Sequence, residues 1–163
     1  MLNIFSEHVL SVRKWLNTDD NRIFNPEEAP APAASYSNLA ILPPGKRILV
    51  IAGQIGNLID GSMVEGLEAQ YEQTLKNIHA LVTSQGGSKH DIARITVFLT
   101  EEPSDWSKIK DANEKYLNQP PPAKTWIYVS KLFKPEVKVE IEALAAVDWL
   151  LRILNLVRSF VKN

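Results

Sequence analysis

The hydrophobic period of the chain changes at a pair of glycines, Gly86 and Gly87, and this change strongly constrains the fold. Before the pair, a segment that starts near Ser62 has its larger side chains at helical spacing. These positions are Leu67, Tyr71, Thr74, Leu75, Ile78, Leu81 and Val82. After the pair, residues 91–100 alternate and are rich in β-branched side chains, which is typical of a strand. The glycines therefore predict the end of a helix and a return into a sheet.

Shorter patterns predict the other elements. The apolar run 48–52 ends at Gly53, which favours a buried strand. A second helix is expected from Ser104, as its N-cap, to Leu117, with prolines at 120–122 after it. Its expected buried contacts are Trp106, Ile109 and Tyr116. Two more strands are expected at 125–132 and 137–147. The resulting order is strand, helix, strand, helix, strand, strand, which predicts an α+β domain.

The ends of the chain predict two further elements. Residues 1–20 and 148–163 both have the spacing of amphipathic helices, and the Pro/Ala-rich segment 25–38 is expected to be an extended connector. The apolar face of 148–163 should pack on the domain, on the first helix or on a neighbouring subunit. Its basic residues leave contact with a membrane surface as the less favoured alternative. The predicted division is therefore 1–20, 25–147 and 148–163.

Composition excludes several classes of protein. The 163 residues include no cysteine, so disulfides, thiolate nucleophiles and cysteine metal sites are excluded and a reducing, cytoplasmic location is expected. A net charge of -1 gives no electrostatic reason to expect a nucleic-acid partner. The three histidines are scattered, which predicts no metal site. Neither GxSxG nor GxGxxG occurs, so no nucleophile elbow or dinucleotide site is predicted.

A few polar residues at the expected strand edges remain as site candidates. They are Tyr36, Gln54, Lys124 and Glu140. Lys124 attracts attention because it stands where a proline-rich loop enters an apolar strand, a place where a fixed charge usually needs a reason. From their own properties, these residues indicate no more than a water-exposed edge of an α+β domain.

Four stretches nevertheless resemble one known family. They are APAASYSNLA, ILVIAGQIG, EAQYEQTLKNIHALVTSQGGSKHDIARITVFLT and PPPAKTWIYVSKLFKPEVKVEIEALA. Together they cover about 25–147 and are similar to the reactive intermediate deaminases, the RidA or YjgF family. The resemblance implies a chorismate-mutase-like fold, in which a mixed sheet carries two helices on one face. It also implies a homotrimer with clefts between subunits.

The resemblance implies an activity as well. Members of the family hydrolyse imines and enamines of amino acids to 2-oxo acids and ammonia, without a cofactor. At the position of Lys124 an arginine binds the substrate carboxylate, and at that of Glu140 a carboxylate holds the attacking water near the backbone of Trp126. Tyr36 and the backbone around Gly53 would line the cleft.

Three departures from the family pattern predict an altered specificity. Lys124 replaces the arginine, Lys110 stands in the place of an asparagine near the cleft, and Ser35 replaces a proline. Lysine keeps the charge but lacks the planar fork that binds a carboxylate through two hydrogen bonds. Two lysines in one cleft could also lower each other's pKa, which would make one of them a proton donor or a nucleophile.

The predicted function is therefore an imine or enamine hydrolase that acts on a small anionic metabolite. Two alternatives stay open. One is that the scaffold catalyses another acid-base reaction, such as isomerisation, dehydration or cyclisation, with Lys124 and Glu140 as the acid and base. The other is a ligand-binding module without catalysis.

Overall fold

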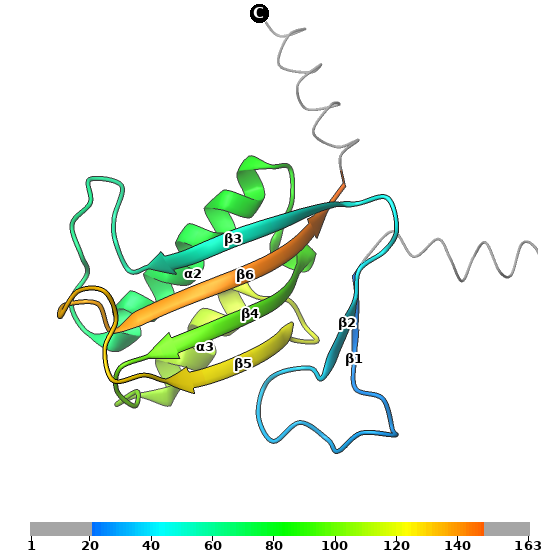
Figure 1. The fold of residues 1–163 in the computed structure, drawn as a ribbon, viewed down its shortest axis with the longest axis horizontal. Helices are drawn as coiled ribbons and strands as arrows, with labels where there is room; N and C mark the ends of the chain where they lie inside the picture. The colour runs from blue at the N-terminus through cyan, green and yellow to red at the C-terminus, as the bar shows by residue number, and fades with distance from the viewer. Residues whose placement is uncertain (1–20, 149–163) are drawn as a thin grey trace, which may run out of the picture.

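The computed structural model of the protein describes residues 21–148, which form a four-stranded sheet with both helices on one face (Figure 1). The strands are β3 (Arg47–Ile55), β4 (Ile92–Leu99), β5 (Ala123–Tyr128) and β6 (Val139–Val147), and their order across the sheet is β3-β6-β4-β5. β5 runs parallel to β4, whereas β6 is antiparallel to both β3 and β4. The sheet is therefore mixed, and the predicted α+β class is confirmed.

The helix before the glycine pair is α2 (Leu67–Ser84), and six of its seven predicted positions are buried. The exception is Leu81, which is 42% exposed. Its buried residues are Leu67, Gln70, Tyr71, Thr74, Leu75, Ile78 and Val82. Gly86 follows the helix with a φ of 86°, a conformation that glycine adopts without steric cost. A short 3-10 turn, η1 (Lys89–Asp91), then leads into β4. The predicted return from helix to sheet is thus confirmed.

The second helix, α3 (Trp106–Tyr116), differs from the prediction at its start. Its N-cap is Asp105, whose carboxylate accepts a hydrogen bond from the Ser107 N–H at 2.9 Å, so the assignment of Ser104 was wrong. Ser104 instead donates to Glu68 Oε1 on α2, from its N–H at 2.7 Å and from its hydroxyl at 2.8 Å. These bonds lower the pKa of Glu68 to about 2. The start of α3 is therefore fixed by a carboxylate on the other helix.

The prediction that Trp106 is buried was also wrong, because its side chain is 49% exposed. Ile109, one turn further, is buried as expected. Trp106 stands at the first position of α3, where the helix reaches the edge of the sheet next to β5. The exposed ring lines a cavity there rather than the core.

Two short strands that the sequence did not predict lie on either side of the connector 25–38. β1 (Arg22–Phe24) and β2 (Leu39–Ile41) pair antiparallel beside the main sheet (Figure 1). Strands of three residues are too short to show an alternating pattern, so the composition of this segment indicated only an extended chain. Ser37 forms a parallel bridge with Ala123, and its N–H donates to the Pro122 carbonyl at 3.3 Å. This contact attaches the connector to the start of β5.

β3 is longer than the predicted run 48–52 and continues past Gly53 to Ile55. Its pairing with β6 shifts by one residue between Ile51 and Gln54, which is a β-bulge. The apolar run that predicted this strand ends at Gly53, within the bulge, and for that reason the pattern stopped early. The prediction that the strand is buried was wrong, because β3 is at the edge of the sheet and Val50 is 82% exposed. At the bulge, Gly53 faces β6.

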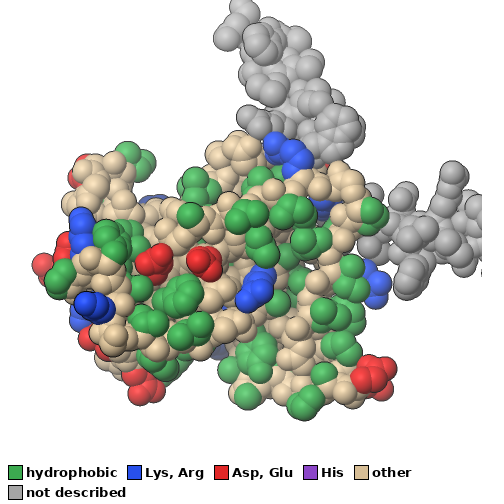
Figure 2. Space-filling model, in the orientation of Figure 1, with side chains coloured by type: hydrophobic (Ala, Val, Ile, Leu, Met, Phe, Trp, Pro, Cys, Tyr) green, Lys and Arg blue, Asp and Glu red, His purple; other side chains and the backbone are tan. Residues whose placement is uncertain are grey.

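The face of the sheet opposite the helices is uncovered within the described chain. Val50 is 82% exposed and Ile48 47% exposed, although both lie on a central segment of β3. Figure 2 shows this open face, where hydrophobic side chains surround acidic and basic ones. An uncovered apolar sheet face indicates an interaction surface.

Two predicted elements, the helices at 1–20 and 148–163, fall outside the described residues, apart from Asp148. Among helices within residues 21–148, none has the length and apolar character that crossing a membrane requires.

Candidate functional site

A cavity of about 950 Å³ lies between β5, α3 and the connector. β5 contributes Lys124, Trp126 and Tyr128, α3 contributes Trp106 and Lys110, and the connector contributes Tyr36. The alternation of β5 explains the first three, because residues two apart point to the same face of a strand. That face is the helix side, since Trp126 packs against the buried ring of Tyr71 on α2.

The Lys124 ammonium has an unusual environment. Its Nζ lies 5.9 Å from the centre of the Trp126 ring, and no hydrogen bond or ion pair from residues 21–148 reaches it. Burial lowers the pKa of Lys124 to about 8. The predicted cause was the charge of a second lysine, but desolvation accounts for this shift.

The apolar wall of the cavity is a row of aromatic rings. Trp126 has the Tyr71 ring centre at 5.7 Å and that of Trp106 at 5.6 Å. The Tyr71 hydroxyl donates to Asn113 Oδ1 on α3 at 2.7 Å, and burial raises the pKa of this phenol. The indole Nε1 of Trp126 is buried and has no partner among the residues that the structure describes. The row therefore offers flat apolar surface to the cavity, while the indole N–H of Trp126 is buried.

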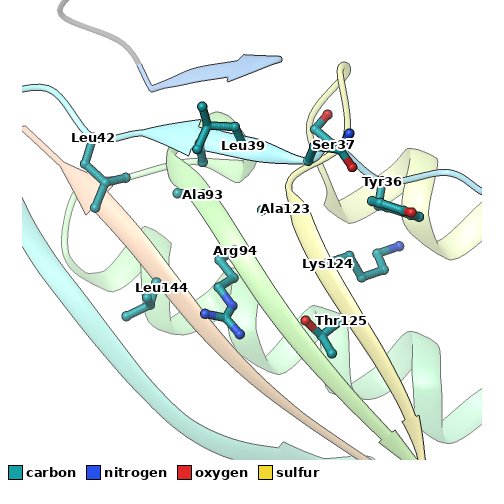
Figure 3. Close-up of a pocket in the computed structure, with 12 residues that line it drawn as sticks. Tyr36, Ser37, Leu39, Leu42, Ala93, Arg94, Ala123, Lys124, Thr125 and Leu144 are labelled. Carbon is teal, nitrogen blue, oxygen red and sulfur yellow. The ribbon is translucent and has the colours of Figure 1, made fainter. Parts of the chain in front are cut away.

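Tyr36 and Lys110 complete this part of the site. Figure 3 shows a neighbouring cavity of about 350 Å³, in which Tyr36 and Lys124 also take part. The Tyr36 hydroxyl accepts a hydrogen bond from the Ala33 N–H at 3.3 Å, which holds the connector loop in place. Lys110 Nζ lies 3.7 Å from Glu114 Oε1 on the exposed side of α3. Lys110 is thus at the mouth of the cavity and has its own carboxylate partner.

Gly53 and Glu140 lie together elsewhere, on the open face of the sheet. Alternation along β6 points Ile141 into the core, and so it points Glu140 to the side away from the helices. A Cβ atom on Gly53 would overlap the Glu140 carboxylate, with its Cδ at 2.7 Å. The absence of a side chain at the bulge therefore makes room for this carboxylate.

The structure thus groups the six predicted residues into two half-sites. We call Tyr36, Lys110, Lys124 and Trp126 the lysine half-site. We call Gly53 and Glu140 the glutamate half-site. Because Lys124 and Glu140 are on opposite faces of the sheet, they are not an acid-base pair within one chain. Among residues 21–148, no cluster of three metal-ligating side chains occurs.

Sequence reasoning did not identify two aromatic residues of the cavity, Trp106 and Tyr128. Tyr128 could have been found, because it follows Lys124 and Trp126 at the two-residue spacing of one strand face. Trp106 was expected in the core because large apolar rings on a helix usually pack inward.

Comparison with known proteins gives these half-sites a family context. Residues 26–147 match the family model described as endoribonuclease L-PSP. A RutC family protein of Pyrococcus horikoshii is 36% identical over 123 residues, which cover 73% of this chain and 92% of that protein. The 2-iminobutanoate/2-iminopropanoate deaminase of Salmonella typhimurium is 32% identical over 125 residues, with 73% and 92% of the two chains covered.

Solved structures agree with the sequence matches. A conserved Rid family protein from Yersinia pestis superposes with a TM-score of 0.68 at 28% identity, over 78% of this chain and 99% of that one. RidA from an Antarctic Psychrobacter gives a TM-score of 0.57 at 30% identity, over 77% and 99%. The fold is therefore the chorismate-mutase-like fold of these proteins. With its sequence matches and its fold in agreement, the chain belongs to the RidA/YjgF family.

Proposed function

We propose that this protein is an imine or enamine deaminase, which hydrolyses 2-imino acids to 2-oxo acids and ammonia without a cofactor. The observation that carries the proposal is the Lys124 ammonium, which is partly buried in a cavity and has no anionic partner among residues 21–148. A cation that is desolvated without a counter-ion is stabilised when an anionic ligand binds. The carboxylate of a 2-imino acid is such a ligand.

The remaining residues have roles that follow from their positions. Lys124 binds the carboxylate, Trp126 lies against the substrate, and Tyr36 and Lys110 border the entrance. Glu140 orients the attacking water and accepts its proton. An imine carbon is already electrophilic, so orientation of one water and of the substrate can supply much of the rate acceleration. The deaminase of Salmonella typhimurium supports this assignment as a relative that is named for such substrates.

The two half-sites imply that a second copy of the chain completes the site. We propose a homotrimer in which the lysine half-site of one chain faces the glutamate half-site of the next. Two observations support this arrangement. Lys124 and Glu140 point to opposite faces of one sheet, and the open face around Glu140 carries the exposed side chains of Ile48 and Val50. Burying those side chains against a neighbour would remove apolar surface from water.

The test is to generate 2-iminopropanoate in situ with an amino-acid oxidase and to measure ammonia and 2-oxopropanoate. The protein should release both faster than buffer alone. Lys124→Arg should retain activity because arginine also binds carboxylates, whereas Lys124→Met should lose it because the charge is gone. A release rate equal to that of buffer for the unaltered protein and for Lys124→Arg would contradict the proposal.

Anion binding should depend on pH through Lys124. The pKa of Lys124 is lowered to about 8, so the free site is charged below this pH and neutral above it. We therefore expect the inhibition constant of 2-oxopropanoate to be constant below pH 7 and to rise about tenfold per pH unit above pH 8. In Lys124→Arg the inhibition constant should not change between pH 7 and pH 10, because arginine stays charged. A flat profile in the unaltered protein would show that Lys124 does not bind the anion.

A further inference from the structure

Lys124 differs from the other described lysines in being partly buried without an oxygen partner. Lys46, Lys89, Lys108, Lys110, Lys115 and Lys138 each have an oxygen partner within 4.0 Å. Lys76, Lys131 and Lys134 are exposed to solvent. Lys124 Nζ has an indole ring and an open cavity instead. An amine that faces space large enough for a ligand, with no oxygen holding it, is free to react with what enters.

We propose that the Lys124 amine is a nucleophile that forms an imine with carbonyl compounds bearing an aryl or other large apolar substituent. The neutral amine attacks the carbonyl carbon, and its nitrogen loses two protons as the carbonyl oxygen leaves in water. A C=N bond to Lys124 then replaces the C=O bond, with no change of oxidation state. The reverse reaction with water restores both partners.

The aromatic lining of the cavity indicates the chemistry of the carbonyl compound. The volume of about 950 Å³ is that of a single chain, and in the proposed homotrimer the neighbouring chain takes part of it, so the lining and not the volume carries the argument. Trp106, Trp126 and Tyr128 supply aromatic surface around Lys124, and Trp106 is half exposed although it is a large apolar ring. Aromatic side chains bind flat apolar groups through area burial and offset stacking.

Within one chain, the environment of Lys124 favours a neutral amine, whereas Glu140 of the neighbouring chain in the proposed homotrimer would act in the opposite direction. The charged and titratable side chains that share the cavity are Lys110 and Glu114 from α3, Tyr36 from the connector and Tyr128 from β5. Lys110 and Glu114 pair with each other at 3.7 Å, so Glu114 does not hold the Lys124 ammonium. Burial lowers the pKa of Lys124 to about 8, which leaves a substantial neutral fraction near neutral pH.

The inference does not rest on the proposed deamination. Binding of a carboxylate uses the Lys124 ammonium, whereas formation of an imine uses the neutral amine. The two uses therefore belong to different protonation states of one side chain.

The experiment uses the full-length protein with 3-phenylpropanal as the probe and sodium cyanoborohydride as the reductant, which converts the imine to a stable secondary amine. Digestion and mass spectrometry then give the modified fraction of each lysine. We expect Lys124 to be modified about ten times faster than the exposed Lys108 at pH 7.5, because burial leaves a substantial part of the Lys124 amine neutral and the cavity holds the probe beside it. Propanal, which lacks the ring, should show a smaller preference for Lys124.

A pH series and one variant show whether the modification depends on the amine of Lys124. The trapping rate at Lys124 should rise to about pH 8 and then level off, because the amine is then largely neutral. Lys108→Arg, a matched change on the exposed side of α3, should leave modification of Lys124 unchanged. Equal modification of Lys124 and Lys108 would overturn the proposal. Trapping without ammonia release from imino acids would refute the deaminase alone, and ammonia release without trapping would leave Lys124 as an anion-binding residue only.

Discussion

Glu140→Gln is expected to lower kcat/KM for 2-iminopropanoate by about 10²–10⁴-fold. Glutamine has the shape of glutamate and fits over Gly53, but it cannot accept the proton of the attacking water. The loss should appear mainly in kcat, since Lys124 and Trp126 still bind the substrate. Steady-state kinetics with coupled detection of ammonia would measure it.

Two further variants separate this effect from a general disturbance of the open face. Glu142→Gln changes an exposed carboxylate two residues along the same face of β6 and should keep full activity. Gly53→Ala introduces a methyl group where the Glu140 carboxylate lies, so it should displace the carboxylate and lower kcat as well. Equal rates for Glu140→Gln and the unaltered protein would remove Glu140 from the mechanism.

Gly56→Ala is expected to lower the free energy of unfolding by about 2–3 kcal/mol. Gly56 is buried where the chain leaves β3, and a Cβ atom there would lie 2.5 Å from the Cα atom of Gln70 on α2. That neighbour is backbone within a helix and cannot rotate away. The shift would also strain the bonds of the Gln70 side chain to Val64, Glu136 and Lys138. Urea denaturation followed by circular dichroism would measure the change.

Gly45→Ala provides the comparison for this prediction. Gly45 has a φ of 87° and open space around its Cα atom, so alanine there costs only the backbone strain, about 1–2 kcal/mol. A loss at Gly56 smaller than that at Gly45 would mean that β3 and α2 move apart without cost.

Long segments with a regular hydrophobic period were predictable from the sequence, whereas the N-cap of α3 and the bulge of β3 were not. The spacing of Leu67 to Val82 and the glycines after it predicted α2, because a core-facing helix repeats its pattern over several turns. The N-cap of α3 was placed one residue early. Ser104 and Asp105 are both good caps, and only the Glu68 carboxylate, distant in sequence, decides between them. The same limit applies to the bulge of β3, where pairing with β6 determines the geometry.

The sequence supplied a set of candidate site residues but not their arrangement in space. The family resemblance selected Lys124 and Glu140 by position. Their placement on opposite faces could have been inferred only after β5 and β6 had been assigned to one sheet in a known register. The lowered pKa of Lys124 was anticipated, but its cause is burial among aromatic rings, which depends on how α3 packs over β5.

The division of the site between two faces has a genetic consequence. If the half-sites of neighbouring chains meet, a chain that lacks Lys124 still donates a working Glu140, and a chain that lacks Glu140 still donates a working Lys124. Neither mutant chain would be active alone, yet a mixed trimer would contain a subunit interface at which an intact Lys124 faces an intact Glu140. Two inactive alleles would then complement each other, and a cell that carries both would show partial activity although each allele alone shows none.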